Sequence, residues 1–260
     1  MFKKSSLYEL KRKLKSARSM QYRILATIIF AMLAITIFIG GISVYEVDQY
    51  IQNETEKYVV VTCENKATQI DAFFGDMEKS VKVMESYVMD FFTEDVVVED
   101  REFQGKVISN ARRMFADVAK HTSGAIAYYF RLDPAISDGK AGLFYSRTER
   151  SEEYVCYEPT DILLYDKDDV EHVGWFWQPY QEGKSVWMLP YHNQNVDTKM
   201  VSYVVPMYYK EVFVGVVGMD FDYAFLAERV HEVEVYEHGF AHLEIDGEVV
   251  VYTNHFPVNF

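Results

Sequence analysis

Residues 199–221 have the sequence KMVSYVVPMYYKEVFVGVVGMDF, and this stretch decides the fold. Two runs rich in Val, Tyr, Phe and Met, 199–209 and 212–221, flank the pair Lys210-Glu211. Such residues favour strands, and a short polar pair between two strands is typical of a hairpin. The stretch therefore predicts two neighbouring antiparallel strands.

Further strands are expected upstream of this hairpin. Residues 125–132 (AIAYYFRL) alternate, so that positions 126, 128, 130 and 132 share one face while Tyr129 and Arg131 share the other. Residues 142–148 and 185–190 have a similar composition between turns. Together these segments predict a mainly antiparallel sheet of about five strands.

Helical spacing governs the rest of the chain. Apolar residues recur from Val47 to Phe91, and no Pro interrupts 46–92, which predicts one helix that would extend about 70 Å at 1.5 Å per residue. We call residues 46–92 the stalk. An ordinary core helix is the alternative, but most such helices end by about 20 residues. The spacing from Phe103 to Val118 predicts a second helix that ends near Ser123-Gly124, and residues 221–235 predict a third.

The last residues indicate the start of another module. Segments 240–245 and 249–252 flank Asp246-Gly247, a strong hairpin signal. Only eight residues follow, too few to complete a sheet. We therefore expect the chain to be a fragment or a truncated product, with 236–260 as an incomplete module.

Charge divides the chain of 260 residues sharply. Its 26 Lys and Arg against 40 Asp and Glu give a net charge of −14, which disfavours nucleic-acid binding. Residues 1–23 nevertheless carry a net charge of +7, and residues 24–45 contain no charged residue. About 20 apolar residues span a membrane, so 24–45 predicts a transmembrane helix in the plasma membrane. The basic tail, 1–23, is expected in the cytoplasm and 46–260 outside.

A cleaved signal peptide is the rival interpretation of this segment. The apolar run is longer than the usual 7–15 residues of a signal peptide, and Ser43-Val44-Tyr45 is a poor cleavage site. An uncleaved anchor is therefore favoured.

No catalytic or cofactor motif is recognisable. The sequence has no Gly-rich phosphate loop, His-Glu-x-x-His or Gly-x-Ser-x-Gly pattern, and His238 and His242 lie where a strand begins, so neither enzyme activity nor a metal site or cofactor is predicted. The two cysteines, Cys63 on the stalk and Cys156 in an expected loop, are predicted to be packed thiols, although Cys63 could link a dimer.

Several short segments in order resemble a known family. They are Gly174-Trp175, Trp187-Met188-Leu189-Pro190-Tyr191, Ser202-Tyr203-Val204-Val205-Pro206 and Gly215-Val216-Val217-Gly218-Met219-Asp220. This order resembles the distal module of the double Cache (dCache) sensor domains of bacterial transmembrane receptors. Tyr129-Phe130-Arg131-Leu132-Asp133-Pro134 with Gly142-Leu143-Phe144-Tyr145 resembles the subset fused to diguanylate cyclases or histidine kinases. The resemblance covers roughly 45–260.

The resemblance implies an α+β fold. A transmembrane helix would lead into the stalk helix, a distal PAS-like antiparallel sheet module at 93–235, and the start of a membrane-proximal PAS-like module at 236–260. It also implies a ligand between the distal sheet and a lid of loops, a second membrane helix, and a cytoplasmic output domain that this sequence does not contain.

The family also implies a ligand set, from which this sequence departs. Amino-acid-binding members use an Arg two residues before the Trp for the ligand carboxylate, and a Tyr, an Asp and a later Asp around the ammonium group. Trp175, Tyr191 and Asp220 match this pattern, whereas Val173 replaces the Arg and Asn193 the first Asp. Without the Arg fork an ordinary α-amino acid is disfavoured.

The residues themselves favour a small amine. Aromatic faces and a desolvated acid both favour positive charge, and Asp220 supplies an acid at the end of an apolar strand, whereas Asp222 fits a helix cap better. Arg131 could form a structural pair or hold an anion, and Asp168 and Asp169 could hold the far end of a polyamine. The candidate ligand-binding residues are Trp175, Trp177, Trp187, Tyr191, Asn193, Tyr203, Asp220, Tyr129 and Arg131.

The predicted function is a membrane-anchored extracytoplasmic sensor. An amine or amino-acid-like ligand would bind the distal module, and the stalk helices of a homodimer would report it across the membrane. The alternative is an adhesion or scaffolding ectodomain with a filled core and a protein partner. A secreted hydrolase is disfavoured because no nucleophile is paired with a base.

Overall fold

A computed structural model describes residues 3–147, 153–194, 196–233, 240–245 and 248–252. The chain divides into two compact units, Met1–Val61 and Thr62–Phe260. The predicted turn at Asp246-Gly247 and the candidate residue His238 lie outside the described residues.

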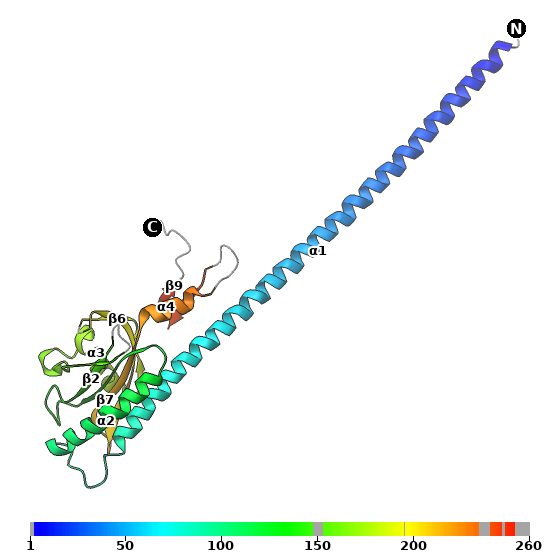
Figure 1. Ribbon diagram of the computed structural model, residues 1–260. Helices are drawn as coiled ribbons and strands as arrows, with labels where there is room; N and C mark the ends of the chain where they lie inside the picture. The colour runs from blue at the N-terminus through cyan, green and yellow to red at the C-terminus, as the bar shows by residue number, and fades with distance from the viewer. Residues whose placement is uncertain (1–2, 148–152, 195, 234–239, 246–247, 253–260) are drawn as a thin grey trace. The chain divides into compact units, whose positions relative to one another are not determined.

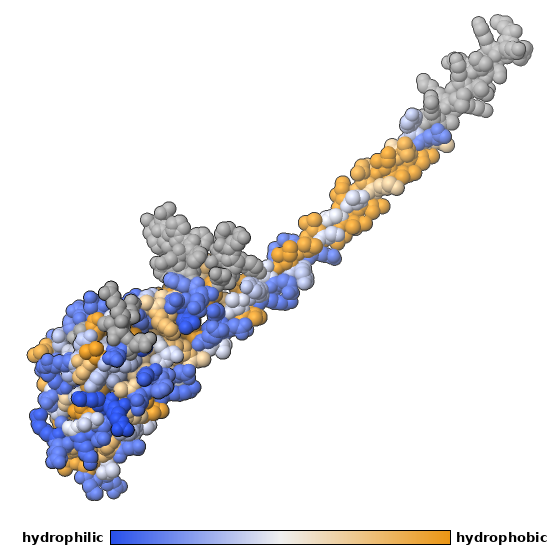
Figure 2. Space-filling view, in the orientation of Figure 1, coloured by the Kyte–Doolittle hydropathy of each residue, from blue (hydrophilic) through white to orange (hydrophobic). Residues whose placement is uncertain are grey.

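The first helix, α1, runs from Lys3 to Met89. Its part in the first unit carries exposed apolar side chains over the segment predicted to cross a membrane, which form the orange band along the helix in Figure 2. Within the described residues, α1 is the one helix long and apolar enough to span a membrane. The helix predicted for 46–92 is thus confirmed to Met89.

The second unit is built on a seven-stranded antiparallel sheet with the order β3-β2-β1-β7-β6-β4, and β5 pairs with β6 beside β4. The strands are β1 (Ala125–Leu132), β2 (Gly142–Ser146), β3 (Val155–Tyr157), β4 (Val186–Trp187), β5 (Tyr191–Asn193), β6 (Thr198–Tyr209) and β7 (Val212–Asp222). The predicted hairpin is β6–β7, and Lys210 and Glu211 both adopt the positive φ that a tight turn requires. The short strands β3 and β5 were not predicted.

Helices cover both faces of this sheet. The distal part of α1 and helix α2 (Arg101–His121), which lies alongside it in Figure 1, pack on one face through residues such as Met84, Phe115 and Phe130. Helix α3 (Val170–Glu182) and the short 3-10 helix η1 (Ile162–Leu164) pack on the other through Phe176, Val204 and their neighbours. Each central strand is therefore buried on both sides, as its nearly continuous apolar sequence requires.

Helix α3 was not predicted, because no helix or strand was expected over residues 170–182. The side chain of Asp169 accepts a hydrogen bond from the backbone N–H of His172 and caps the helix, and Gly183 ends it in the left-handed conformation. Asp169 thus serves as a cap, and neither Asp168 nor Asp169 lines the cavity described below.

Helix α4 (Tyr223–His231) follows β7 directly. Asp222 accepts a hydrogen bond from the N–H of Ala224 at 2.8 Å, which confirms its predicted role as a cap. The hairpin strands β8 (His242–Ile245) and β9 (Glu248–Tyr252) then pair with each other.

The cysteines also differ from expectation. Both Cys63 and Cys156 are exposed free thiols, and Cys156 lies in β3, at the edge of the sheet. A packed thiol was predicted at each position. An edge strand leaves side chains open to solvent where an inner strand would cover them.

Candidate ligand-binding site

A cavity lies on the face of the sheet that α3 covers. Its volume is about 20 Å³, enough for about one water molecule. Small-molecule sites are larger, so a ligand would have to be small and would displace side chains of the lining. The residues that line it are Tyr129, Arg131, Phe144, Thr160, Trp175, Tyr191, Asn193 and Asp220.

Asp220 lies on β7, opposite Ala127 of β1 and Ser202 of β6. Its side chain is 1% exposed, and Oδ1 has no hydrogen-bond partner in the described part of the chain. Burial raises the pKa of Asp220 to about 7, although the hydroxyl groups of Ser202 and Tyr129 offset part of this effect. The cavity therefore contains a carboxyl group whose charged form has few stabilising partners.

Tyr129 lies next to this acid because β7 has a glycine beneath it. Tyr129 pairs with Gly218, and a Cβ atom at Gly218 would overlap the Tyr129 ring. The absence of a side chain lets the ring lie over β7. Its buried hydroxyl has no hydrogen-bond partner among the described residues.

Aromatic rings form one wall of the cavity. Trp175 packs edge-on against Tyr129 with the ring centroids 5.1 Å apart, and Phe144 lies 6.4 Å from Tyr129. The indole Nε1 of Trp175 donates to the carbonyl of His172 at 2.8 Å, which holds the ring in place from within α3. The Arg131 guanidinium already lies over the Trp175 ring.

Strand β5 supplies the next polar groups. The hydroxyl groups of Tyr191 and Ser202 are hydrogen bonded at 3.0 Å, and burial raises the pKa of Tyr191 well above its usual value. Asn193 is buried, and its amide contacts the sulfur of Met200 at 3.5 Å. Both β5 side chains thus reach the cavity from alternate positions of one strand.

Arg131 approaches from β1. Its Nη2 donates to the carbonyl oxygens of Gly139 at 2.6 Å and Thr160 at 2.7 Å, and its guanidinium carbon lies 5.7 Å from the centroid of Trp175. Arg131 therefore ties the loop after β1 to the segment before η1, and Thr160, which lines the cavity, lies in that segment.

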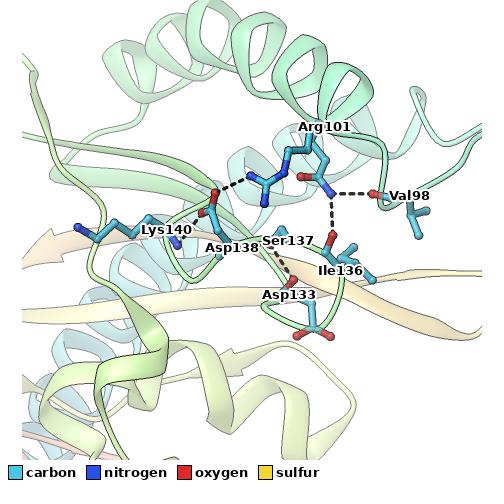
Figure 3. A network of polar contacts seen from close by, with 8 residues as sticks. Val98, Arg101, Asp133, Ile136, Ser137, Asp138 and Lys140 are labelled. Atoms are coloured by element: carbon cyan, nitrogen blue, oxygen red, sulfur yellow. Dashed lines mark hydrogen bonds and ion pairs between the residues drawn. The ribbon is translucent and has the colours of Figure 1, made fainter.

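The loop after β1 is itself fixed to α2, as Figure 3 shows. Arg101 bonds the carboxylate of Asp138 at 3.2 Å, and the amide of Gln104 donates to the carbonyl oxygens of Val98 and Ile136, each at 2.8 Å. This network holds the loop after β1 in place. The carbonyl oxygen of Gly139 in that loop accepts the hydrogen bond from Arg131.

Comparison with known proteins identifies this arrangement. Residues 112–228 match the family model described as methyl-accepting chemotaxis protein-like, first PDC sensor domain. Over these residues the chain resembles a Cache-type sensor domain. Among curated proteins, none matches the sequence.

Solved structures share the fold of the sensor domain. The extracellular domain of soHK1S-Z6, described as a histidine kinase, is 14% identical over 71% of this chain and 65% of that chain, with a TM-score of 0.51. That of mmHK1S-Z2, described likewise, is 16% identical over 74% and 70%, also with a TM-score of 0.51. The chain thus spans about two thirds of the length of these proteins. The ligand-binding domain of the Campylobacter jejuni chemoreceptor Tlp3, in complex with L-norvaline, is 13% identical over 74% and 69%, with a TM-score of 0.43.

Six of the nine residues predicted for a ligand site lie together around the cavity. Three come from β1 and β7, one from α3 and two from β5. They are Tyr129, Arg131, Asp220, Trp175, Tyr191 and Asn193.

Trp187 and Tyr203, by contrast, lie on the opposite face of the sheet. They pair directly in β4 and β6, with ring centroids 4.7 Å apart, and Trp187 donates from Nε1 to Glu78 of α1 at 2.7 Å. Because adjacent residues of a strand point to opposite faces, Tyr203 cannot share a face with Ser202, which lies opposite Asp220. These two residues join the sheet to α1.

Trp177 is also outside the cavity lining. It follows Trp175 by two positions, which is about 200° around a helix, so the two rings leave α3 on opposite sides. Trp177 packs against Phe176 and Tyr180, and Lys167 lies 4.2 Å from its ring centroid.

Two lining residues were not predicted. Phe144 pairs with Tyr129 across β1 and β2 and so shares its face, a relation that the alternation of both segments could have indicated. Thr160 lies in irregular chain between β3 and η1, where no periodic pattern marks it.

Proposed function

We propose that this chain is the ligand-binding and membrane-anchoring part of a receptor that binds a small amine in the sensor-domain cavity. The observation that carries the proposal is the wholly buried Asp220 with one oxygen lacking a hydrogen-bond partner. A buried charge without a partner destabilises the protein. A ligand that brings a positive charge would remove this cost, and the free energy released would contribute to its binding.

The surrounding rings support the same ligand class. Trp175, Tyr129 and Phe144 offer aromatic surface within one cavity, and an ammonium group is attracted to the faces of such rings. A small volume with aromatic walls and one acid favours a compact amine over a larger molecule.

Signalling would pass through α1. Trp187 pairs with Tyr203 of β6, the strand next to Asp220, and donates a hydrogen bond to Glu78 of α1. Displacement of β6 on ligand binding would therefore shift α1 as well. A ligand shifts such an equilibrium only if it binds the two arrangements with different affinity.

The remaining features of the receptor follow from the sequence. Residues 24–45 would cross the plasma membrane with the basic tail in the cytoplasm, and the exposed apolar residues Val47, Tyr50 and Ile51 would pair in a homodimer. The output domain, a cyclase or kinase in the related subset, would belong to the longer protein.

Calorimetry tests the proposal. The full chain in detergent is titrated with a panel of amines, amino acids and carboxylates, and Asp220→Asn is compared with Tyr203→Phe, which alters the opposite face of the sheet. We expect binding of at least one amine that Asp220→Asn abolishes and Tyr203→Phe preserves. Absence of binding by every compound to folded protein would refute the proposal.

The alternative, a scaffolding ectodomain without a small ligand, predicted a filled core. Trp175, Tyr191 and Asp220 instead line one cavity. No observation on the described residues favours the alternative.

A further inference from the structure

The cavity is too small to admit a ligand unless part of its wall moves. Its volume of about 20 Å³ holds about one water molecule. Seven of the eight lining residues belong to strands or to α3, and Thr160 alone lies in irregular chain. Strands within a sheet are bonded to their neighbours, whereas irregular chain at the surface opens more readily. The wall around Thr160 is therefore the part that can open at the lowest cost.

We call residues 158–164, which include η1, the lid segment. The chain is fixed on either side of it, because β3 pairs with β2 before it and the ring of Tyr165 stacks on His172 of α3 after it, with centroids 4.4 Å apart. Within the lid segment only Ile162 is buried, and both leucines of η1 are exposed. Little apolar surface thus holds the lid segment against the rest of the domain.

Hydrogen bonds to β1 and to the loop after it hold the lid segment closed. Nη2 of Arg131 donates to the carbonyl oxygen of Thr160 at 2.7 Å and to that of Gly139 at 2.6 Å. The Gly139 oxygen also accepts a hydrogen bond from the backbone N–H of Ile162 at 3.0 Å. Arg131 therefore links the cavity wall at Thr160 directly to the loop after β1.

That loop is the fixed partner in this contact. The network in Figure 3 ties it to α2, in part through the ion pair of Arg101 with Asp138. Gly139 packs closely on the lid segment, since a Cβ atom at Gly139 would lie 2.0 Å from Oδ1 of Asp161. When the two segments separate, the lid segment is therefore the one that moves.

The bonds of Arg131 are suited to release. Its guanidinium group is buried, and Nε has no hydrogen-bond partner among the described residues. Opening would break the charge-assisted bond to Thr160, but it would also admit water to the guanidinium group. Hydration thus offsets part of the cost of opening, so the closed arrangement can be left without unfolding the domain.

We propose that the lid segment opens to admit the ligand and that Arg131 is the positioning residue that keeps it closed. The guanidinium carbon of Arg131 also lies 5.7 Å from the ring centroid of Trp175, so the same side chain contacts a second part of the cavity wall. The inference rests on the proposed function for the nature of the ligand. The opening itself is a property of the protein alone and is measurable with no ligand present.

Hydrogen–deuterium exchange of the full chain in detergent tests the opening at the Ile162 amide, which is bonded to Gly139. In the wild type this amide should exchange at least 100-fold faster than the amides of β7, at a rate that low concentrations of urea leave unchanged, because local opening exposes little surface. Exchange with the rate and urea dependence of β7 would overturn the inference, since the lid segment would then open only on global unfolding.

Arg131→Met tests the role of the side chain, because it removes the donors and keeps an apolar stem. We expect the Ile162 amide to exchange at least tenfold faster, while exchange in β7 stays unchanged. Glu158→Gln is the matched control, since it breaks an exposed ion pair of the lid segment with Lys140 and should change the rate less than twofold. A wild-type rate in Arg131→Met would overturn the role of Arg131.

Gly139→Ala gives a second test if Arg131→Met does not fold. The added methyl group would overlap Asp161 of the lid segment and leaves the cavity lining unaltered. It should also speed exchange of the Ile162 amide at least tenfold. Unchanged exchange in this variant would overturn the inference, because the lid segment would then not be closed by its contact with the loop after β1.

The amine panel separates this inference from the proposed function. An amine that binds should slow exchange of the Ile162 amide in the wild type, and it should dissociate at least tenfold faster from Arg131→Met. An amine that binds without slowing this exchange would overturn the role of the lid segment in ligand entry. Absence of binding by every amine would instead refute the proposed function, while exchange without ligand would still decide whether Arg131 holds the lid segment closed.

Discussion

Replacing Asp220 with Asn should stabilise the protein, and the gain should increase with pH. The Asp220 carboxyl keeps its proton up to a pH of about 7 in the folded protein, whereas in the unfolded chain it ionises near pH 4. Between these values the folded state binds more protons than the unfolded state, so the stability of the wild type falls as pH rises. Asn carries no such cost.

The size of the effect follows from the shift. A difference between about 4 and about 7, at about 1.4 kcal/mol per pKa unit, corresponds to about 4 kcal/mol once the pH exceeds 7. About 1.5 kcal/mol of this is already present at pH 5. The stability difference between Asp220→Asn and wild type should therefore grow by about 3 kcal/mol from pH 5 to pH 8.

Urea unfolding of the full chain in detergent, followed by tryptophan fluorescence at pH 5 and pH 8, measures this difference. All three tryptophans, Trp175, Trp177 and Trp187, lie in the sensor-domain unit. Asp222→Asn is the matched control, because Asn caps a helix about as well as Asp and the change should have little effect. A difference for Asp220→Asn that stays constant between the two pH values would refute the account of a buried, uncompensated carboxyl group.

Three further predictions concern the two faces of the sheet. Trp175→Phe should weaken binding of the best amine of the panel about two- to fivefold, whereas Trp177→Phe on the same helix should leave the affinity measured by calorimetry unchanged. Equal effects of the two substitutions would contradict the placement of the rings. Gly218→Ala should destabilise the protein by about 1–3 kcal/mol through its clash with Tyr129, and Tyr129→Ala should remove most of that cost in a double-mutant cycle of urea unfolding. Trp187→Phe should cost about 1–2 kcal/mol for the lost bond to the α1 carboxylate while amine affinity is kept, and unaltered stability would argue against that bond.

The central strands and helices could be predicted because burial imposes a period on their sequences. The β6–β7 hairpin followed from two apolar runs around Lys210-Glu211, and α1 and α2 followed from apolar steps of three and four. The face shared by Tyr129 and Arg131 followed from alternation along β1, and both line the cavity.

The error at Tyr203 and Trp187 has a specific origin. A regular hairpin around Lys210-Glu211 would place Asp220 opposite Val201 and so on the same face as Tyr203. The structure has a β-bulge between Met207 and Tyr208, which shifts the register by one residue and places Asp220 opposite Ser202. One extra residue therefore moves Tyr203, and with it Trp187, to the face that packs on α1. No residue type in the sequence marks the bulge.

Helix α3 was missed for a different reason. Gly174 and Pro179 lie inside it, and both disfavour the interior of helices. Burial of Val173 and Phe176 against the sheet outweighs this weak local propensity. Its caps, Asp169 and Gly183, were the available signals, because an acid before an apolar run and a glycine after it are typical of helix ends.

The unsatisfied groups of the cavity also bear on how a sensor domain could switch. Asp220, Tyr129 and Arg131 each have a buried polar atom that no described residue bonds. Each such atom costs about 1–3 kcal/mol, so admitting water by opening would stabilise the empty protein. A ligand that bonds the same atoms would remove that advantage. Under the proposed function, a ligand that bonds these atoms would favour this arrangement over a hydrated one, and such a difference in affinity between two states is the condition that a ligand must meet to move β6, Trp187 and α1.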